Sequence, residues 1–166
     1  MTKIDWPNTT SIKRLKIIEE TQDLLVQTNI ASEFTARNDN LVAVKRFWDR
    51  RLADRNIRVA KADKCIIFYK KFNLGNPHDK IGELKNALEA PHNELGDCLF
   101  IDFGVAIPEA QNEQSVRAFF LNDPTARYVM GVRRGVIFIF SIKEAEIIAN
   151  KASSMGFISV LPDALR

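Results

Sequence analysis

The ten residues from Cys98 to Ile107 form the strongest β-strand pattern in this chain of 166 residues. The run is apolar except for Gly104 and one carboxylate, Asp102. A strand of this kind needs neighbouring strands, because its backbone N–H and C=O groups otherwise lack hydrogen-bond partners. The chain is therefore expected to build a β-sheet, and the other patterns have to be interpreted around that sheet.

Side chains along a strand alternate between the two faces of a sheet. Strict alternation places five apolar residues on one face: Leu99, Ile101, Phe103, Val105 and Ile107. It places Asp102 on the opposite face, among smaller residues and one phenylalanine: Cys98, Phe100, Gly104 and Ala106.

Five further β-type runs can supply the neighbouring strands. They span residues 57–61, 65–72, 127–132, 136–142 and 157–161. Short turn segments, Ala62–Lys64 and Arg133–Gly135, separate the first two runs and the next two runs, so two hairpins are expected.

Apolar residues at spacings of three and four predict helices at about 11–28, 39–56, 76–90 and 109–121. In the first helix, one face is assigned Ile12, Leu15, Ile18 and Leu25, with Ile17 and Leu24 beside them. A fifth helix is predicted after Ser141, which forms a capping box with Glu144, and it is expected to end at Gly156.

These elements predict an α+β fold, with a mixed β-sheet of about five or six strands and packed helices, preceded by a two-helix N-terminal segment. Residues 1–56 are expected to form an N-terminal arm and the two helices, and residues 57–166 the sheet domain, within one continuous globular unit. The last β-α-β unit, residues 136–161, is predicted to be a right-handed parallel crossover.

Positive charge is concentrated between Lys45 and Lys71. That window holds ten basic and three acidic residues, a local net charge of +7, whereas residues 72–166 hold nine basic and twelve acidic residues. The basic residues of the window are Lys45, Arg46, Arg50, Arg51, Arg55, Arg58, Lys61, Lys64, Lys70 and Lys71. A field of this sign attracts polyanions or acidic partners.

These ten residues, with Arg133 and Arg134 at a hairpin tip, are the candidate binding site. The leading prediction is a small cytoplasmic accessory or regulatory protein that contacts the phosphates of DNA or RNA through a basic helix and the adjoining hairpin. The alternative is a protein-binding module, such as an inhibitor, immunity protein or adaptor, that recognises an acidic partner. A solvated helix face with internal salt bridges would show the same charge pattern.

A hydrolase or nuclease using Asp102 is a second alternative. A nuclease needs further acids at close spacing, and none follows Asp102 on its strand. We therefore expect Asp102 to be a buried or edge-strand structural residue, and the sequence favours a protein without catalysis.

Other residue patterns exclude several classes of site. Cys65, His78, His92 and Cys98 lack the pairwise spacing of zinc ligands, so no metal is predicted and both cysteines are expected to be buried free thiols. No glycine-rich phosphate loop occurs, so no cofactor is predicted. No apolar run is long enough for a membrane span or a signal peptide, and a cytoplasmic location is therefore expected.

Overall fold

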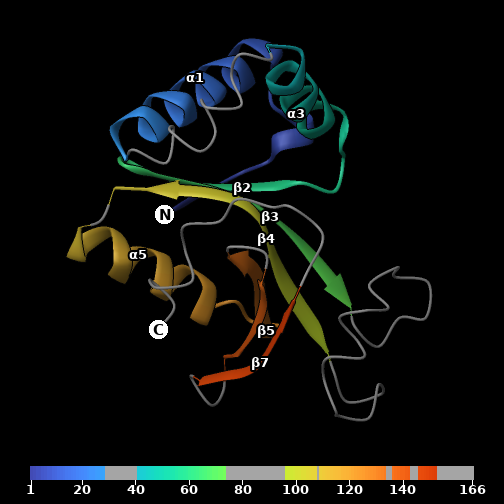
Figure 1. Ribbon diagram of the computed structural model, residues 1–166, viewed down its shortest axis with the longest axis vertical. Coiled ribbons are helices and arrows are strands. Elements are labelled where there is room, and N and C mark those ends of the chain that lie inside the picture. Colours follow the sequence, from blue (N-terminus) through green and yellow to red (C-terminus); the bar gives the residue numbers. More distant parts are fainter. Residues whose placement is uncertain (29–40, 74–95, 108, 134–135, 143–145, 153–166) are drawn as a thin grey trace.

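A computed structural model describes residues 1–28, 41–73, 96–107, 109–133, 136–142 and 146–152 (Figure 1). The described elements are, in chain order, β1 (Thr2–Ile4), η1 (Trp6–Asn8, a 3₁₀ helix), α1 (Ser11–Gln27), α3 (Leu41–Ala53), β2 (Arg58–Ala62), β3 (Cys65–Asn73), β4 (Asp97–Ala106), α5 (Ala110–Leu121), β5 (Ala126–Arg133), β6 (Val136–Ser141) and β7 (Glu146–Ala152). Strands and helices share one structure, which confirms the α+β class.

The described strands form one seven-stranded sheet in which spatial order follows chain order, from β1 at one edge to β7 at the other. Neighbouring strands run antiparallel except for β4 and β5, which run parallel. Parallel neighbours require a long crossover, and α5 supplies it. The sheet is therefore mixed, as predicted, although β1 precedes the two N-terminal helices and joins the same sheet.

Helices cover both faces of the central strands (Figure 1). On one face, α1 and α3 pack over a core that includes Trp6, Trp48, Phe68 and Phe103. On the other face, α5 packs through Val116 and Phe120 over a second core. Because residues before and after position 57 share the first core, the N-terminal helices help to bury the sheet.

Helix α1 confirms the predicted element and part of its predicted apolar face. Its N-cap is Thr10, whose hydroxyl accepts the backbone N–H of Lys13 at 3.4 Å. The helix buries Ile17, Ile18, Thr21, Leu24 and Leu25, whereas Ile12 is 70% exposed and Leu15 is 54% exposed. At 100° per residue, Ile12 lies opposite the buried stripe, so assigning it to the same face as Ile18 was wrong.

Two further predicted helices and both predicted hairpins are confirmed with small shifts at their ends. Helix α3 ends at Ala53, where a carboxylate oxygen of Asp54 accepts the backbone N–H of Asn56 and starts the turn into β2. The β2–β3 and β5–β6 hairpins form, and α5 begins at Ala110. The predicted helix at 76–90, the strand at 157–161 and the hairpin tip at 134–135 lie outside the described residues.

A register shift in β4 overturns the predicted alternation of its faces. Phe68 of β3 lies opposite Phe103, and the next residue, Tyr69, lies opposite Ile101, so Asp102 is an extra residue without a partner on β3. A bulge of this kind reverses the facing of the side chains that follow. Leu99 and Ile101 accordingly face the α5 side, and Phe103 faces the α1 and α3 side.

The predicted C-terminal helix was wrong. Residues 146–152 form β7, which pairs antiparallel with β6, so the capping box at Ser141 starts no helix over these residues and the crossover predicted for residues 136–161 lacks its helix there. The helix propensity of these residues is outweighed by the backbone hydrogen bonds that they form with the edge of β6. The parallel pair of the sheet is instead β4 with β5. Residues 143–145 and 153–166, with Glu144 and Gly156, lie outside the described residues.

None of the helices in the described segments combines the length and apolar character that crossing a membrane requires.

Candidate functional site

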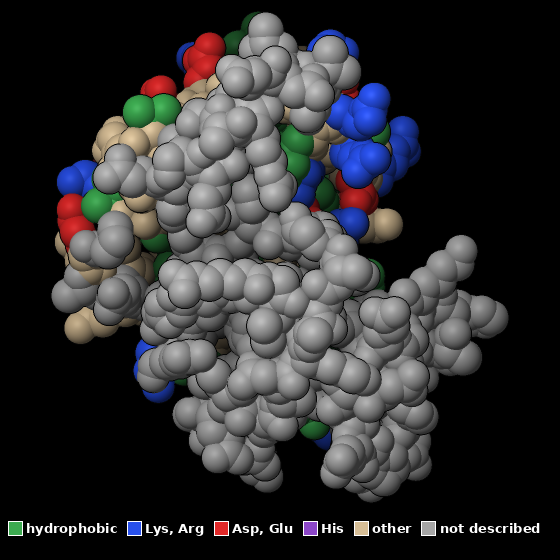
Figure 2. All heavy atoms as spheres, viewed as in Figure 1, with side chains coloured by type: hydrophobic (Ala, Val, Ile, Leu, Met, Phe, Trp, Pro, Cys, Tyr) green, Lys and Arg blue, Asp and Glu red, His purple; other side chains and the backbone are tan. Residues whose placement is uncertain are grey.

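The basic residues between Lys45 and Lys71 come from three elements and the turns between them. Helix α3 carries Lys45, Arg46, Arg50 and Arg51, the turn after it carries Arg55, and the β2–β3 hairpin carries the rest. Lys and Arg side chains gather beside α3 in the space-filling view (Figure 2). The side chains of Arg133 and Arg134 lie outside the described residues, so their place relative to this surface is not given.

The five lysines of this window are all ion-paired with carboxylates. The pairs are Lys45 with Asp49 at 2.9 Å, Lys61 with Glu20, Lys64 with Glu109 at 3.2 Å, Lys70 with Asp54 at 2.5 Å, and Lys71 with Asp97 at 3.8 Å and Asp123 at 2.9 Å. All of these pairs except Lys45–Asp49, which lies within α3, link segments that are far apart in the chain. Each of these lysines therefore has a carboxylate partner within the protein.

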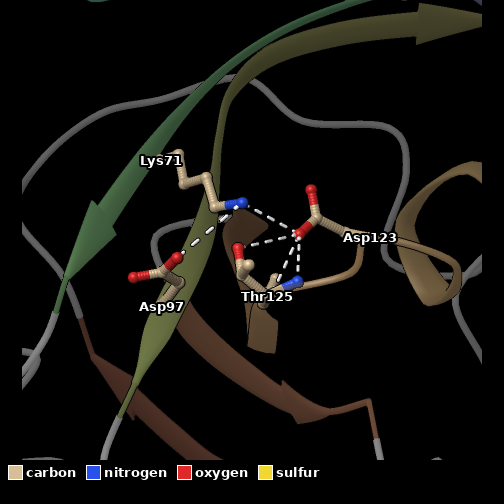
Figure 3. Close-up of polar contacts among 5 residues, drawn as sticks. Lys71, Asp97, Asp123 and Thr125 are labelled. Carbon is tan, nitrogen blue, oxygen red and sulfur yellow. Dashed lines mark hydrogen bonds and ion pairs between the residues drawn. The ribbon is translucent and has the colours of Figure 1, made fainter.

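Lys71 is the most enclosed of these lysines, with 16% of its side chain exposed. Its ammonium group lies between the carboxylates of Asp97, on β4, and Asp123, which follows α5 (Figure 3). One oxygen of Asp123 also accepts the backbone N–H groups of Thr125 and Ala126. Burial alone would raise the pKa of Asp123, but these donors outweigh burial and hold the pKa below its ordinary value.

Arg51 is buried on the inner side of α3 and is not part of the molecular surface. Its Nε lies 3.1 Å from Oδ2 of Asp102, and each side chain is only 8% exposed. The guanidinium carbon lies 3.4 Å from the ring centroid of Phe47, and the backbone carbonyl of Arg51 accepts the indole N–H of Trp6 at 2.9 Å. A guanidinium held in this way cannot reach a phosphate outside the protein.

Asp102 has the buried structural position that we expected for it. Burial raises the pKa of Asp102, and the neighbouring Arg51 guanidinium opposes that rise. Burial likewise lowers the pKa of Arg51. A catalytic carboxylate has to meet its substrate in an accessible cleft. Asp102 instead meets Arg51 in the core, so its geometry favours a structural role.

Four arginines of the window remain at the surface: Arg46, Arg50, Arg55 and Arg58. All four are exposed, and none forms an ion pair with a carboxylate of the described residues. They follow one another along α3, around the α3–β2 turn and into the start of β2. We call these four residues the arginine surface.

A cleft of about 340 Å³ lies at one end of the arginine surface. Its lining includes Arg55 and Arg58, together with Lys70 and Lys71 of β3 and Asp5 before η1. A cleft that gathers four cations can hold an anionic group.

The described residues provide no alternative chemical centre of the kinds considered above. They contain no group of three His, Cys, Asp or Glu residues that could hold a metal ion. Cys65 and Cys98 are free and buried, as predicted. Burial raises the pKa of Cys65 to about 12 and raises that of Cys98 as well, so neither thiol is poised as a nucleophile. His78 and His92 lie outside the described residues.

Comparisons with protein-family models, curated proteins and solved structures find no match to this chain. Its function therefore has to be inferred from the chemistry of its own residues.

Proposed function

We propose that this chain is a small cytoplasmic nucleic-acid-binding protein with an accessory or regulatory role, and that the arginine surface contacts the phosphate backbone. One observation carries the proposal. In the same basic window, five lysines have carboxylate partners and one arginine is buried, whereas four exposed arginines have no carboxylate partner among the described residues.

The chemistry of arginine supports phosphate as the target. A guanidinium stays charged at any physiological pH and can donate two parallel N–H groups to two phosphate oxygens. Arg46 and Arg50 lie four residues apart on α3, a spacing at which like charges destabilise a helix by about 0.2–0.5 kcal/mol. A bound polyanion would remove that repulsion. Binding therefore explains why two arginines stand at this spacing, whereas helix stability does not.

An acidic protein surface is the partner that experiment must separate from nucleic acid, because the same charges serve both. Phosphate contacts release counterions, so the logarithm of the affinity for nucleic acid falls steeply and linearly with the logarithm of the salt concentration. A pull-down from a nuclease-treated lysate that still recovers one protein would instead identify an acidic protein partner.

The test is fluorescence anisotropy of labelled single-stranded DNA, duplex DNA and single-stranded RNA between about 50 and about 200 mM salt. The double variant Arg46→Gln/Arg50→Gln should lose about tenfold or more in affinity, since two charged phosphate contacts are removed. The matched control is Lys3→Gln/Lys64→Gln, which removes two exposed charges from β1 and from the β2–β3 turn. Equal affinity of the two double variants, or no binding by the parent protein at low salt, would refute the proposal.

A further inference from the structure

The cleft at the end of the arginine surface lies where β3 runs on beyond β2. Arg58, the first residue of β2, pairs with Tyr69, so Lys70, Lys71 and Phe72 extend past the start of β2. Residues 55–58 of the α3–β2 connection form one wall of the cleft, and residues 4–7 around η1 form another. The cleft therefore lies where the end of β3, the α3–β2 connection and the segment around η1 meet.

Charge in this cleft is unevenly compensated. The carboxylates that pair with Lys70 and Lys71 come from Asp54, Asp97 and Asp123, and none of these three residues lines the cleft. Arg55 and Arg58 have no carboxylate partner among the described residues. Asp5 is the acid of the described lining, and one of its oxygens accepts the side-chain N–H of Asn8 at 2.9 Å. The wall formed by Arg55 and Arg58 is therefore the side that an anion would contact.

We propose that this cleft binds one phosphate group of a single nucleic-acid strand; the proposal rests on the proposed function and assigns a specific site to it. A phosphate matches the two arginines because its oxygens accept paired guanidinium N–H groups. The volume of about 340 Å³ lies at the lower end of the range for small-ligand sites, about 300–1,000 Å³. It has room for a phosphate and part of its sugar, but not for two paired strands.

The aromatic residues of the lining argue that the cleft holds backbone rather than bases. Trp6 is fully buried and packs edge-on against Phe68, so its ring face is not open for stacking. Phe72 packs against Phe100. Sequence-independent binding of single strands normally uses open aromatic faces for the bases. Trp6 offers no such face and Phe72 is half-buried beside Phe100, so recognition in the cleft is directed at the phosphate and is independent of base sequence.

The direct test titrates the full chain with inorganic phosphate and follows the arginine side-chain N–H signals by NMR. The signals of Arg55 and Arg58 should shift in a saturable way, and those of Arg46 and Arg50 should not. The variant Arg58→Gln should weaken phosphate binding by about tenfold, because one charged hydrogen-bonding group is lost. Lys16→Gln, which removes one positive charge from an exposed site on α1 outside both the cleft and the arginine surface, should stay within about twofold.

A second variant separates an electrostatic role from a structural one. Asp5→Asn removes the negative charge of the described lining, so it should tighten phosphate binding by about two- to threefold. Loss of folding would not produce that gain. If Arg58→Gln does not fold by circular dichroism, Arg55→Gln in the exposed turn takes its place. No saturable shift with phosphate, or unchanged affinity in both the arginine variant and Asp5→Asn, would overturn the proposal.

The same variants distinguish failure of the cleft from failure of the proposed function. A 5′-phosphorylated oligothymidylate should compete with inorganic phosphate in the parent protein but not in Arg58→Gln. If the oligonucleotide binds but Arg58→Gln leaves the affinity for inorganic phosphate unchanged, the cleft proposal fails and the arginine surface stands. If phosphate saturates the cleft but no oligonucleotide binds, the assignment to a nucleic-acid strand fails along with the proposed function.

Discussion

Arg51 of α3 and Asp102 of β4 form an ion pair inside the protein, with Nε and Oδ2 3.1 Å apart. The pair depends on the β4 bulge, because Asp102 is the extra residue at which the facing of the strand reverses. A buried charge without a partner costs several kcal/mol, so each residue is needed to accommodate the other. The ion pair thus fixes how α3 sits on the sheet, and thereby where the arginine surface lies.

Removal of one partner should destabilise the protein strongly. Arg51→Met leaves the buried carboxylate unpaired and should lower the free energy of unfolding by about 3–5 kcal/mol in urea titrations. The double variant Arg51→Met/Asp102→Leu should lose much less than the sum of the two single changes, since no buried charge remains. Strictly additive losses would show that the two side chains are not coupled.

Asp123 should make stability depend on pH. Its pKa is lower in the folded chain than in the unfolded chain, so its contribution is present above the unfolded value of about 3.9 and is lost as pH falls through the folded value. Asp123→Asn should therefore cost about 1–3 kcal/mol at pH 7 and progressively less below about pH 4. Urea titrations across this range measure the difference, with Asp63→Asn in the exposed β2–β3 turn as the control. A difference that does not change with pH would contradict the assignment.

The two cysteines should be unreactive in the folded protein. Both are fully buried, and burial raises the pKa of Cys65 to about 12, so little thiolate forms at neutral pH. The reagent 5,5′-dithiobis(2-nitrobenzoic acid) should label neither thiol quickly in native buffer and both quickly in urea. Rapid labelling of one thiol in native buffer would show that the strand carrying it opens readily.

The arginine surface should account for the salt dependence of nucleic-acid binding. Each of the single changes Arg46→Gln and Arg50→Gln should reduce the slope of log affinity against log salt by about 0.7 for single strands or about 0.9 for duplex DNA. Lys64→Gln should leave the slope unchanged, because Lys64 is already paired with Glu109. An equal effect of all three variants would mean that only overall net charge matters.

Local patterns in the sequence were sufficient for much of the secondary structure. The apolar spacing of α1, α3 and α5 and the alternation within the two hairpins arise from contacts between residues near in the chain. The concentration of basic residues around α3 is also a property of the sequence alone. The sequence also contained a signal of the buried pair. Arg51 lies beside the apolar stripe of its helix and Asp102 lies within an apolar strand, but the two point to a pair only when the helix and the strand are considered together.

Only the tertiary structure decided the pairing of the strands and the pairing of the charges. Whether residues 146–152 form a helix or a strand depends on the free edge of β6, and the bulge at Asp102 depends on its register with β3, so neither is set by neighbours in sequence. A count of charges likewise treats Lys70 and Arg58 alike. Folding brings Asp54 to Lys70 and brings no described carboxylate to Arg58, because ion pairs form between side chains that packing places within a few ångströms of each other.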